Sequence, residues 1–373
     1  MSTPPIRWSP LKLSYHVRTY AFGARLIPER LGKTGLPEGI VAETWEVSDH
    51  RDAPATITAG PDRWVGKLLH ELVEAEPDAL VGEGWRGPHF PILGKFLDAS
   101  HMLPVHLHAD DETARRRHGE PHGKSEAWHI LWCAPEATIL AGIKPGLGHD
   151  ELRAAFKAQD YDAVMFRYPI RPGDTVYVPG GILHSFGPDT LIYEAQQTSD
   201  LGQSVMPTDL HGTRLSAEQW DANIEATLAE LKTDALPRPQ SGLAREDGTG
   251  NRFVVGGAGP YFALERWALA TAHREPAHPW RALLLSNVGG PVRLICDAGE
   301  TTLERAESCL LPAAIGEVTV LPIGSEATDL VACYLPDLGR DVVAPLRAAG
   351  HSDAAIAALG AEVLPANEGS VNP

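Results

Sequence analysis

The sequence lacks the features that define several large classes of protein. No run of about 20 apolar residues could span a membrane, and the first residues, MSTPPIRWSP, contain no apolar signal core. Four scattered cysteines without CxxC spacing favour buried thiols in a reducing cytoplasm over a disulfide framework. No glycine-rich nucleotide loop and no GxSxG motif occurs. We therefore expect a cytoplasmic protein. We do not expect a membrane protein, a secreted protein, a nucleotide-binding protein or a serine hydrolase.

Positive charge is also scarce. The chain has 32 lysine and arginine residues against 49 aspartate and glutamate residues, which makes the net charge −17. This balance argues against a nucleic-acid backbone as the main partner. It also makes an anionic substrate awkward unless basic side chains gather locally.

Turn residues and short strand patterns are abundant. The chain contains 36 glycines and 31 prolines in 373 residues, a length typical of two domains. Short strand-like runs at intervals of about ten residues predict an all-β sandwich or barrel in each half. We expect a first domain over residues 1–235 with a helical insert around 200–235, a linker over 236–251, and a second domain over 252–373. Helical spacing of apolar residues predicts helices over 62–75, 151–158, 216–231 and 353–359.

Three segments of the first half carry candidate metal ligands. His106 and His108 lie in the run VHLHADD, and on a strand their spacing puts both imidazoles on one face. Glu126 stands at the head of an expected strand, and a turn with Gly173, Pro179 and Gly181 leads to His184. Imidazole and carboxylate ligands suit zinc, iron, manganese, cobalt or nickel. The motifs resemble the two motifs of the cupin superfamily.

Six elements, in order, are similar to those of the type I mannose-6-phosphate isomerase family. The resemblance covers most of the first 200 residues; in the second half it is limited to the strand pattern. The six elements are 43–48 (ETWEVS), 95–99 (KFLDA), 108–111 (HADD), 123–126 (GKSE), 179–184 (PGGILH) and 194–200 (EAQQTSD). The resemblance implies two cupin-type jelly-roll barrels. Because the second half contains only three histidines and no HxH pair, we expect its barrel to lack a metal ion.

The resemblance also implies which residues hold the metal ion. The family's four ligand positions fall on His106, His108, Glu126 and His184. A histidine stands at 106 where the family usually has glutamine. We expect one divalent metal, with zinc first and manganese, iron, cobalt or nickel as alternatives.

Catalytic roles are implied for three further residues. Lys124 matches the lysine beside the family's metal-binding glutamate, Glu194 is a candidate general base, and Lys95 lies on a strand near the pocket. The family continues after EAQQTSD with an arginine of the catalytic pocket, but this chain has Ser204 there. Candidates for holding an anionic substrate group are therefore Arg115, Arg116, Arg117 and Arg214.

The sequence supports three functional hypotheses. The first is a metal-dependent aldose–ketose isomerase acting through an enediol. The second is a related metal cupin that isomerises, epimerises or oxidises an unphosphorylated sugar or glycoside. The third is a non-catalytic sugar-binding cupin. In each case the partner is a small-molecule sugar or sugar phosphate, with no nucleic acid and no membrane, and the protein is a monomer or homodimer.

Overall fold

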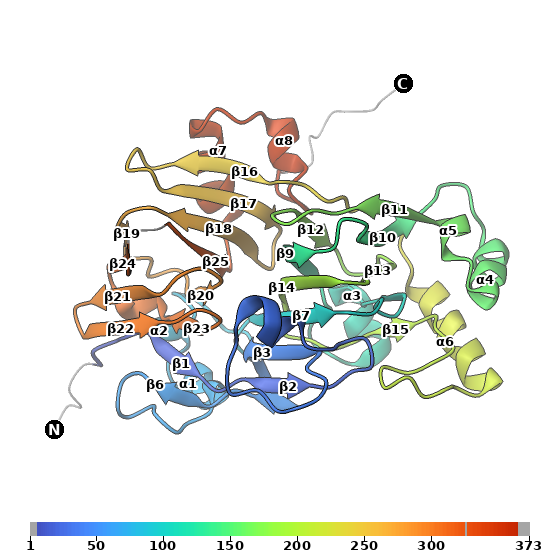
Figure 1. The fold of residues 1–373 in the computed structure, drawn as a ribbon, viewed down its shortest axis with the longest axis horizontal. Helices are drawn as coiled ribbons and strands as arrows, with labels where there is room; N and C mark the ends of the chain where they lie inside the picture. The colour runs from blue at the N-terminus through green and yellow to red at the C-terminus, as the bar shows by residue number, and fades with distance from the viewer. Residues whose placement is uncertain (1–5, 325–326, 365–373) are drawn as a thin grey trace.

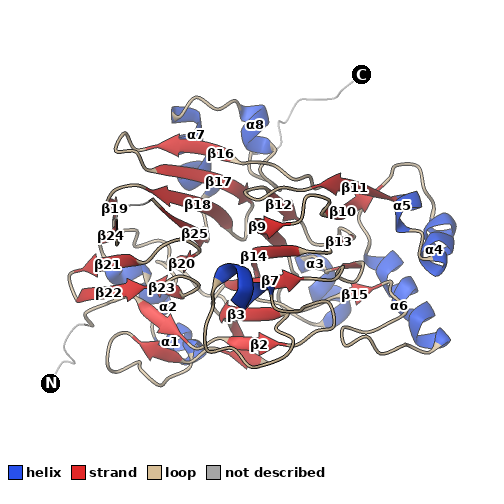
Figure 2. Ribbon diagram, viewed as in Figure 1, coloured by secondary structure: helices blue, strands red, loops and turns tan. Residues whose placement is uncertain are grey.

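The protein is built mainly from β-sheets, with short helices around their edges (Figures 1 and 2). The computed structural model describes residues 6–324 and 327–364. The two longest helices, α4 (His149–Ala158) and α6 (Ala217–Glu230), lie together at one end of the molecule. The remaining helical segments are η1 (Ile27–Leu31), α1 (Leu69–Ala75), α2 (Pro77–Leu80), α3 (Asp111–Thr113), η2 (Ala114–His118), α5 (Tyr161–Val164), η3 (Ala313–Ile315), η4 (Leu338–Val343), α7 (Ala344–Ala348) and α8 (Asp353–Ala357).

Two facing sheets form the first half. The six-stranded sheet has the order β12 (Thr175–Val178), β9 (Glu126–Cys133), β14 (Thr190–Gln197), β7 (Ile92–Ala99), β3 (Glu43–Val47) and β2 (His16–Arg18). The five-stranded sheet has the order β11 (Met165–Pro169), β10 (Thr138–Ile143), β13 (His184–Gly187), β8 (His106–Leu107) and β15 (Gln203–Ser204). Side chains from both sheets, among them Trp128 and Phe186, form one buried cluster between them. The outer face of the five-stranded sheet packs against α4 and α6 through residues such as Leu107 and Leu183.

A second pair of sheets contains most of the C-terminal half. The larger has the order β16 (Leu243–Glu246), β17 (Arg252–Ala258), β18 (Ala263–Leu269), β25 (Thr328–Tyr334), β20 (Leu283–Asn287), β23 (Ser308–Leu311), β1 (Leu11–Leu13) and β6 (Ile57–Ala59). The smaller has the order β19 (His273–Glu275), β24 (Val318–Pro322), β21 (Val292–Cys296) and β22 (Gly299–Leu303). The hairpin β4 (Asp49–His50) and β5 (Ala53–Pro54) stands apart.

The two halves share a hydrophobic core. Phe96 and Tyr193, from the six-stranded sheet, belong to the same buried cluster as Leu284 and Val331 from the eight-stranded sheet. Two N-terminal strands, β1 and β6, also complete the edge of the C-terminal sheet, where Leu11 pairs with Leu310 (Figure 1). The first 60 residues therefore contribute to the sheets of both halves.

Most of the expected elements occur, with local differences. Helix α6 begins after Ser216, whose hydroxyl accepts a hydrogen bond from Gln219, as its capping spacing predicts. The helix expected over 62–75 starts only at Leu69, because Gly66 has a positive φ and turns the chain. The expected linker 236–251 contains β16, which pairs with β17 along the edge of the sheet. Helix α7 has no counterpart among the expected helices.

The described cysteines are all free thiols, and Cys133, Cys309 and Cys333 are buried. Burial raises the pKa of the Cys309 thiol to about 12. None of the described helices combines the length and apolar character that crossing a bilayer requires.

Candidate metal centre and substrate cavity

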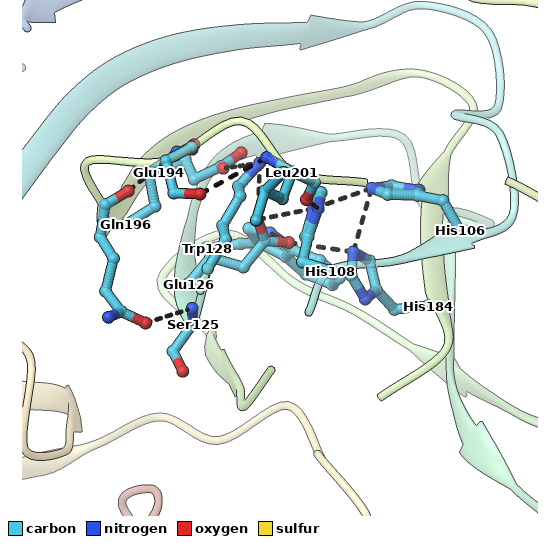
Figure 3. Close-up of polar contacts among 12 residues, drawn as sticks. His106, His108, Ser125, Glu126, Trp128, His184, Glu194, Gln196 and Leu201 are labelled. Carbon is cyan, nitrogen blue, oxygen red and sulfur yellow. Dashed lines mark hydrogen bonds and ion pairs between the residues drawn. The ribbon is translucent and has the colours of Figure 1, made fainter. Parts of the chain in front are cut away.

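Three imidazoles converge between the two sheets of the first half. His106 lies on β8, His108 follows it, and His184 begins β13, where it pairs in register with His106. The Nε2 atom of His106 lies 3.2 Å from that of His108 and 3.1 Å from that of His184. Figure 3 shows the three rings turned toward one another. The shared face expected for His106 and His108 is confirmed, since Leu107 between them points to the helices instead.

Backbone carbonyls set the orientation of all three rings. The Nδ1 atoms donate to the carbonyl oxygens of Pro104, Leu201 and Ile182 at 2.7, 2.7 and 2.8 Å, respectively. A carbonyl oxygen only accepts hydrogen bonds, so each neutral ring carries its proton on Nδ1 and has a lone pair on Nε2. Three lone pairs face one another at the centre of the group. Such acceptors repel unless a cation lies among them, and this is the arrangement of metal-ligating histidines.

Glu126 brings a carboxylate to the same centre. It begins β9 and is 2% exposed. Its Oε1 lies 3.0 Å from Nε2 of His184, and its Oε2 lies 3.3 Å from Nε2 of His108. Oε2 is buried without a hydrogen-bond partner among the described residues. A tetrahedral ion with metal–nitrogen bonds of about 2.0–2.1 Å holds its ligand atoms roughly 3.3–3.4 Å apart, so the four side chains fit around one ion.

Burial favours the neutral form of His106 and His108. It lowers the pKa of His108 to about 4, and the positive charge of Lys124 contributes to the same shift. Burial likewise lowers the pKa of His106 well below its ordinary value, followed by the effect of the two neighbouring histidines. A neutral imidazole is the form that binds a metal ion. Together His106, His108 and His184 could hold one.

The glycine turn before His184 connects the ligand segments. The amide of Gly181 donates to the carbonyl of His108 at 2.6 Å, and the amide of Gly180 donates to the Ser125 hydroxyl at 3.2 Å. Gly181 has φ of 94°, a conformation that favours glycine. At Gly180 an added Cβ would lie 2.7 Å from the Cα of Asp110. Both positions require glycine because the turn packs directly on the backbone beside His108.

Four adjacent strands bring charged side chains together on one face of the sheet. Glu126, Glu194, Lys95 and Glu43 lie on β9, β14, β7 and β3, and Lys95 pairs directly opposite Glu194. The Nζ atom of Lys95 lies 3.3 Å from Oε1 of both Glu43 and Glu194. Lys124 lies 3.2 Å from Oε2 of Glu126 and 3.6 Å from Oε1 of Glu194. All five side chains are buried, so each lysine bridges two carboxylates.

This environment shifts the pKa of Glu194 and Lys95 upward. Burial, followed by the negative charge of Glu126, raises the pKa of Glu194 to about 8, although both lysines oppose the shift. Burial alone would lower the pKa of Lys95, but Glu194 and Glu43 outweigh it and raise that pKa above its ordinary value. Glu194 therefore exchanges a proton near neutral pH while Lys95 stays charged.

A cavity of about 200 Å³ opens beside the centre. Its wall includes His106, His108, Glu126 and the two lysines, together with apolar side chains such as Phe22. A second cavity of about 470 Å³ lies next to it, and Asp200 lines both. The three residues given catalytic roles in the sequence analysis, Lys95, Lys124 and Glu194, all line the smaller cavity.

The four arginines expected to hold an anionic group lie elsewhere. Within the described ranges, none of them lines the cavity beside the centre. Arg115 and Arg116 extend from the surface segment η2 toward Asp111 and Glu112, at 3.6 and 3.8 Å. Arg117 lies 3.3 Å from Glu230, and Arg214 is exposed on the loop before α6. Their carboxylate neighbours are four or more residues away on or near helical segments, so a local count of basic residues does not reveal them.

The aspartates after His108 have structural partners. Asp110 caps α3 by accepting a hydrogen bond from the Thr113 amide at 2.8 Å. Asp111 accepts from the Gly123 amide and from the Gln197 side chain.

Sequence reasoning did not assign Glu43, Tyr20 or Asp200 to the site. A recurring Glu-x-Trp pattern could have indicated Glu43. The indole N–H of Trp45 donates to Glu43 at 2.6 Å, and that of Trp128 donates to Glu126 at 3.0 Å. A third copy, Glu265 with Trp267, has the same bond at 2.9 Å on β18. Tyr20 and Asp200 carry no such signal, because loops bring them to the cavity.

The fold and centre define a class: a strand-rich protein with a cupin domain and a three-histidine, one-carboxylate group that could hold a metal ion. Residues 253–324 match the family profile described as "Mannose-6-phosphate isomerase, cupin domain". This match and the relatives below make the chain similar to the mannose-6-phosphate isomerase family of the cupin superfamily, and they support an isomerase. The match lies in the half where the sequence resemblance was limited to strand pattern.

Proteins of similar sequence and structure match this chain over most of its length. Mannose-6-phosphate isomerase from Streptococcus mutans is 27% identical over 309 residues, which are 82% of this chain and 93% of that protein. Mannose-6-phosphate isomerase ManA from Bacillus subtilis is 27% identical over 287 residues, covering 76% of this chain and 87% of that protein. The crystal structure of mannose 6-phosphate isomerase from Bacillus subtilis superposes with a TM-score of 0.76 at 25% identity, covering 87% of this chain and 99% of that one.

Proposed function

We propose that the protein is a metal-dependent aldose–ketose isomerase that moves a proton between C1 and C2 of a sugar through an enediol. The observation that carries this proposal is the convergence of three Nε2 lone pairs and a buried carboxylate beside a cavity that also contains two lysines and Glu194. Metal ligands and a proton-transfer group thus line one space. The similarity to mannose-6-phosphate isomerases supports the same reaction class.

His106, His108, Glu126 and His184 are the proposed ligands of one divalent ion. Zinc is the first choice for this set, and manganese, iron, cobalt and nickel accept the same ligands. A bound divalent ion acts as a Lewis acid that polarises carbonyl and hydroxyl oxygens of the sugar. The protein's own contribution is to hold the imidazoles in one tautomer through three backbone carbonyls.

Glu194 is the proposed general base. With a pKa of about 8 it both accepts and releases a proton near neutral pH, which suits a group that takes a proton from one carbon and returns it to the next. Lys95 holds its carboxylate at 3.3 Å from the opposite strand. Lys124, held between Glu126 and Glu194, is placed to donate to a developing negative oxygen.

The architecture proposed around this site has two cupin-type jelly-roll barrels. Residues 1–235 include the metal barrel and its helical insert, 236–251 form the connection, and 252–373 form a second barrel without metal. Separate buried clusters inside each pair of sheets support two barrels. We place the protein in the cytoplasm as a monomer or homodimer, a proposal that its buried free thiols support.

An activity assay on metal-loaded protein tests the function. We expect the protein to interconvert an aldose and its ketose. Glu126→Gln and His184→Ala should each lower kcat/KM at least about a thousandfold. Both variants should also lose their bound metal, as measured by elemental analysis. His149→Ala, on the exposed first turn of α4, is the matched histidine control. Full activity in the Glu126 or His184 variant would refute the proposal.

A further inference from the structure

A further cavity lies where the two halves of the protein meet, and we call it the arginine cleft. Its volume is about 460 Å³, which is within the usual size range of small-molecule sites. The wall is built from η1, β9, β18, β25 and the turn between β22 and β23, and it includes Arg30, His129, Trp132, Arg266, Arg305 and Asp329. No described residue lines both this cleft and the cavity beside the metal centre. The two spaces are therefore separate.

The charge of the arginine cleft is opposite to that of the whole protein. Among the described residues, the guanidinium groups of Arg30, Arg266 and Arg305 line it against the single carboxylate of Asp329. Burial, followed by the positive charge of Arg266, lowers the pKa of His129 to about 4, so this imidazole adds no charge at neutral pH. The wall is positive in a chain whose net charge is −17.

The acidic residues next to the wall in sequence do not line it. Glu29, Asp174 and Glu304 each adjoin a wall residue along the chain, but none of them belongs to the wall. The carboxylate of Asp174 accepts a hydrogen bond from the Arg171 amide at 2.9 Å. The flanking carboxylates therefore border the cleft and confine its positive charge to the wall.

Two of the three arginines form no ion pair within the described ranges. The guanidinium of Arg30 lies over the ring of Trp132, 4.3 Å from its centroid. Arg305 donates through Nε to the Leu31 carbonyl at 2.7 Å and through Nη2 to the Arg30 carbonyl at 3.3 Å. A ring and two carbonyls hold these groups in place without neutralising them. Their remaining N–H groups can therefore receive an anion.

The third arginine is fixed by its carboxylate and keeps one nitrogen outside that pair. Nε and Nη2 of Arg266 donate to Oδ1 of Asp329 at 3.1 and 2.9 Å. Nη1 takes no part in this pair, and it lies 3.9 Å from the position that a Cβ would occupy on Gly173. Because Gly173 is also a wall residue, the missing side chain leaves this edge of the guanidinium uncovered.

Three guanidinium groups around one space favour an anion with several acceptor oxygens. A phosphate monoester has three such oxygens and a charge of about −1.5 to −2 at neutral pH. Arginine recognises phosphate through pairs of parallel N–H groups. The wall also has apolar members, among them Leu131, Trp132 and Leu191. These suit the carbon skeleton of an ester, which a free phosphate ion lacks.

From this arrangement we propose that the arginine cleft binds a small phosphate monoester, with the phosphate held by Arg30, Arg266 and Arg305. The carbon skeleton lies against the apolar wall. This site does not depend on the proposed isomerase function. His129 follows Glu126 by three residues on β9, so their side chains point to opposite faces of the sheet, and the ligand binds on the face away from the metal centre.

Calorimetric titration of the metal-loaded full chain tests the proposal. The probes are phenyl phosphate and inorganic phosphate, at low ionic strength so that charges are weakly screened. We expect phenyl phosphate to bind with a Kd below about 1 mM and inorganic phosphate to bind at least about threefold more weakly, because only the ester buries apolar surface. No binding of phenyl phosphate up to about 10 mM overturns the proposal. Equal or tighter binding of inorganic phosphate overturns the assignment of an ester.

A pair of double variants locates the bound ligand. Arg30→Gln with Arg305→Gln should weaken phenyl phosphate binding at least about tenfold, since it removes two charged donors. The control, Arg274→Gln with Arg293→Gln, removes the same charge from exposed arginines that lie 3.3 and 3.7 Å from surface glutamates. We expect the control to retain the affinity of the unmodified protein. Equal weakening in both double variants would indicate a general effect of net charge, and no weakening in either would place the ligand elsewhere; both results overturn the proposal.

A single variant separates binding from folding. Arg305 also supports the end of η1 through two carbonyls, whereas Arg30 is exposed and only stacks on Trp132. Arg30→Gln should therefore keep the circular dichroism spectrum and melting temperature of the unmodified protein while weakening phenyl phosphate binding at least about threefold. Unchanged affinity in the folded Arg30→Gln protein overturns the proposal.

Discussion

Gly180→Ala tests whether the glycine turn positions the metal ligands. The turn lies directly on the backbone of the segment that follows His108. A Cβ at 180 would stand 2.7 Å from the Cα of Asp110 and 2.9 Å from both the Asp110 amide nitrogen and the Ala109 carbonyl oxygen. These are backbone atoms, so no side chain can rotate away. The turn or the segment must move.

The size of the effect follows from those distances. Ordinary carbon contacts begin at about 3.5 Å, so the backbone must separate by roughly 0.6–0.8 Å. Metal sites require their ligand distances within about 0.2 Å, and His184 follows the turn by four residues. We therefore expect Gly180→Ala to weaken metal binding about 10–100-fold, the usual result of disturbing the groups that support metal ligands. Overpacking should lower the free energy of unfolding of the metal-free protein by about 1–3 kcal/mol.

The assay is a metal titration against a competing chelator, combined with urea unfolding of the metal-free protein. Gly148→Ala is the matched control. Its Cβ would meet only Glu151 Oε2, at 3.7 Å, and its backbone is extended with φ of −89°. We expect the control to bind metal like the unmodified protein. If Gly180→Ala binds metal within threefold of the unmodified protein, the turn does not set the ligand geometry and the reasoning is refuted.

Three further predictions concern charge and metal. Lys95→Met leaves two buried carboxylates without their shared cation and should lower the free energy of unfolding by about 3–5 kcal/mol in a denaturant titration. The control Lys12→Met removes a partly exposed pair with Glu307 and should lower it by less than about 1 kcal/mol. Equal losses of stability in the two variants would contradict the buried group of charges. Burial would raise the pKa of Glu275, but hydrogen bonds from His273 and His278 outweigh it and lower the pKa from 4.5 to about 2. That depressed pKa adds about 3 kcal/mol to the free energy of unfolding above pH 5, of which about 1 kcal/mol is lost by pH 4 and about 2 kcal/mol by pH 3. The stability difference between the unmodified protein and Glu275→Gln, measured by urea unfolding, should therefore shrink from pH 5 to pH 3. A constant difference would exclude this contribution. Removing the metal with a chelator should lower the melting temperature, since an ion at 100 times its Kd adds about 2.7 kcal/mol, and His184→Ala should show no such shift.

Much of the metal centre could be predicted because its geometry depends on short-range rules. Strand alternation places His106 and His108 on one face, and the glycine positions before His184 indicate a tight turn. The grouping of Glu43, Lys95 and Glu194 could not be predicted. Its members come from strands that are distant in the chain, and their register depends on which strands pair.

The arginines show that residues close together in the sequence need not share a site. Arg115, Arg116 and Arg117 are near Lys124 in sequence, which favoured a common role. In the structure η2 turns them to Asp111, Glu112 and Glu230, the last of which belongs to α6. Sequence proximity does not predict direction, because a helical turn spreads neighbouring side chains around its axis.

The sequence by itself indicated the strand-rich fold, the shared face of His106 and His108 and the turn that delivers His184, because strand period and glycine conformation act over a few residues. Only the tertiary structure decided the electrostatics of the cavity. The carboxyl groups that surround Lys95 and Lys124 come from β3, β9, β14 and a loop. Charges interact across space rather than along the chain, so their balance exists only once the strands have paired.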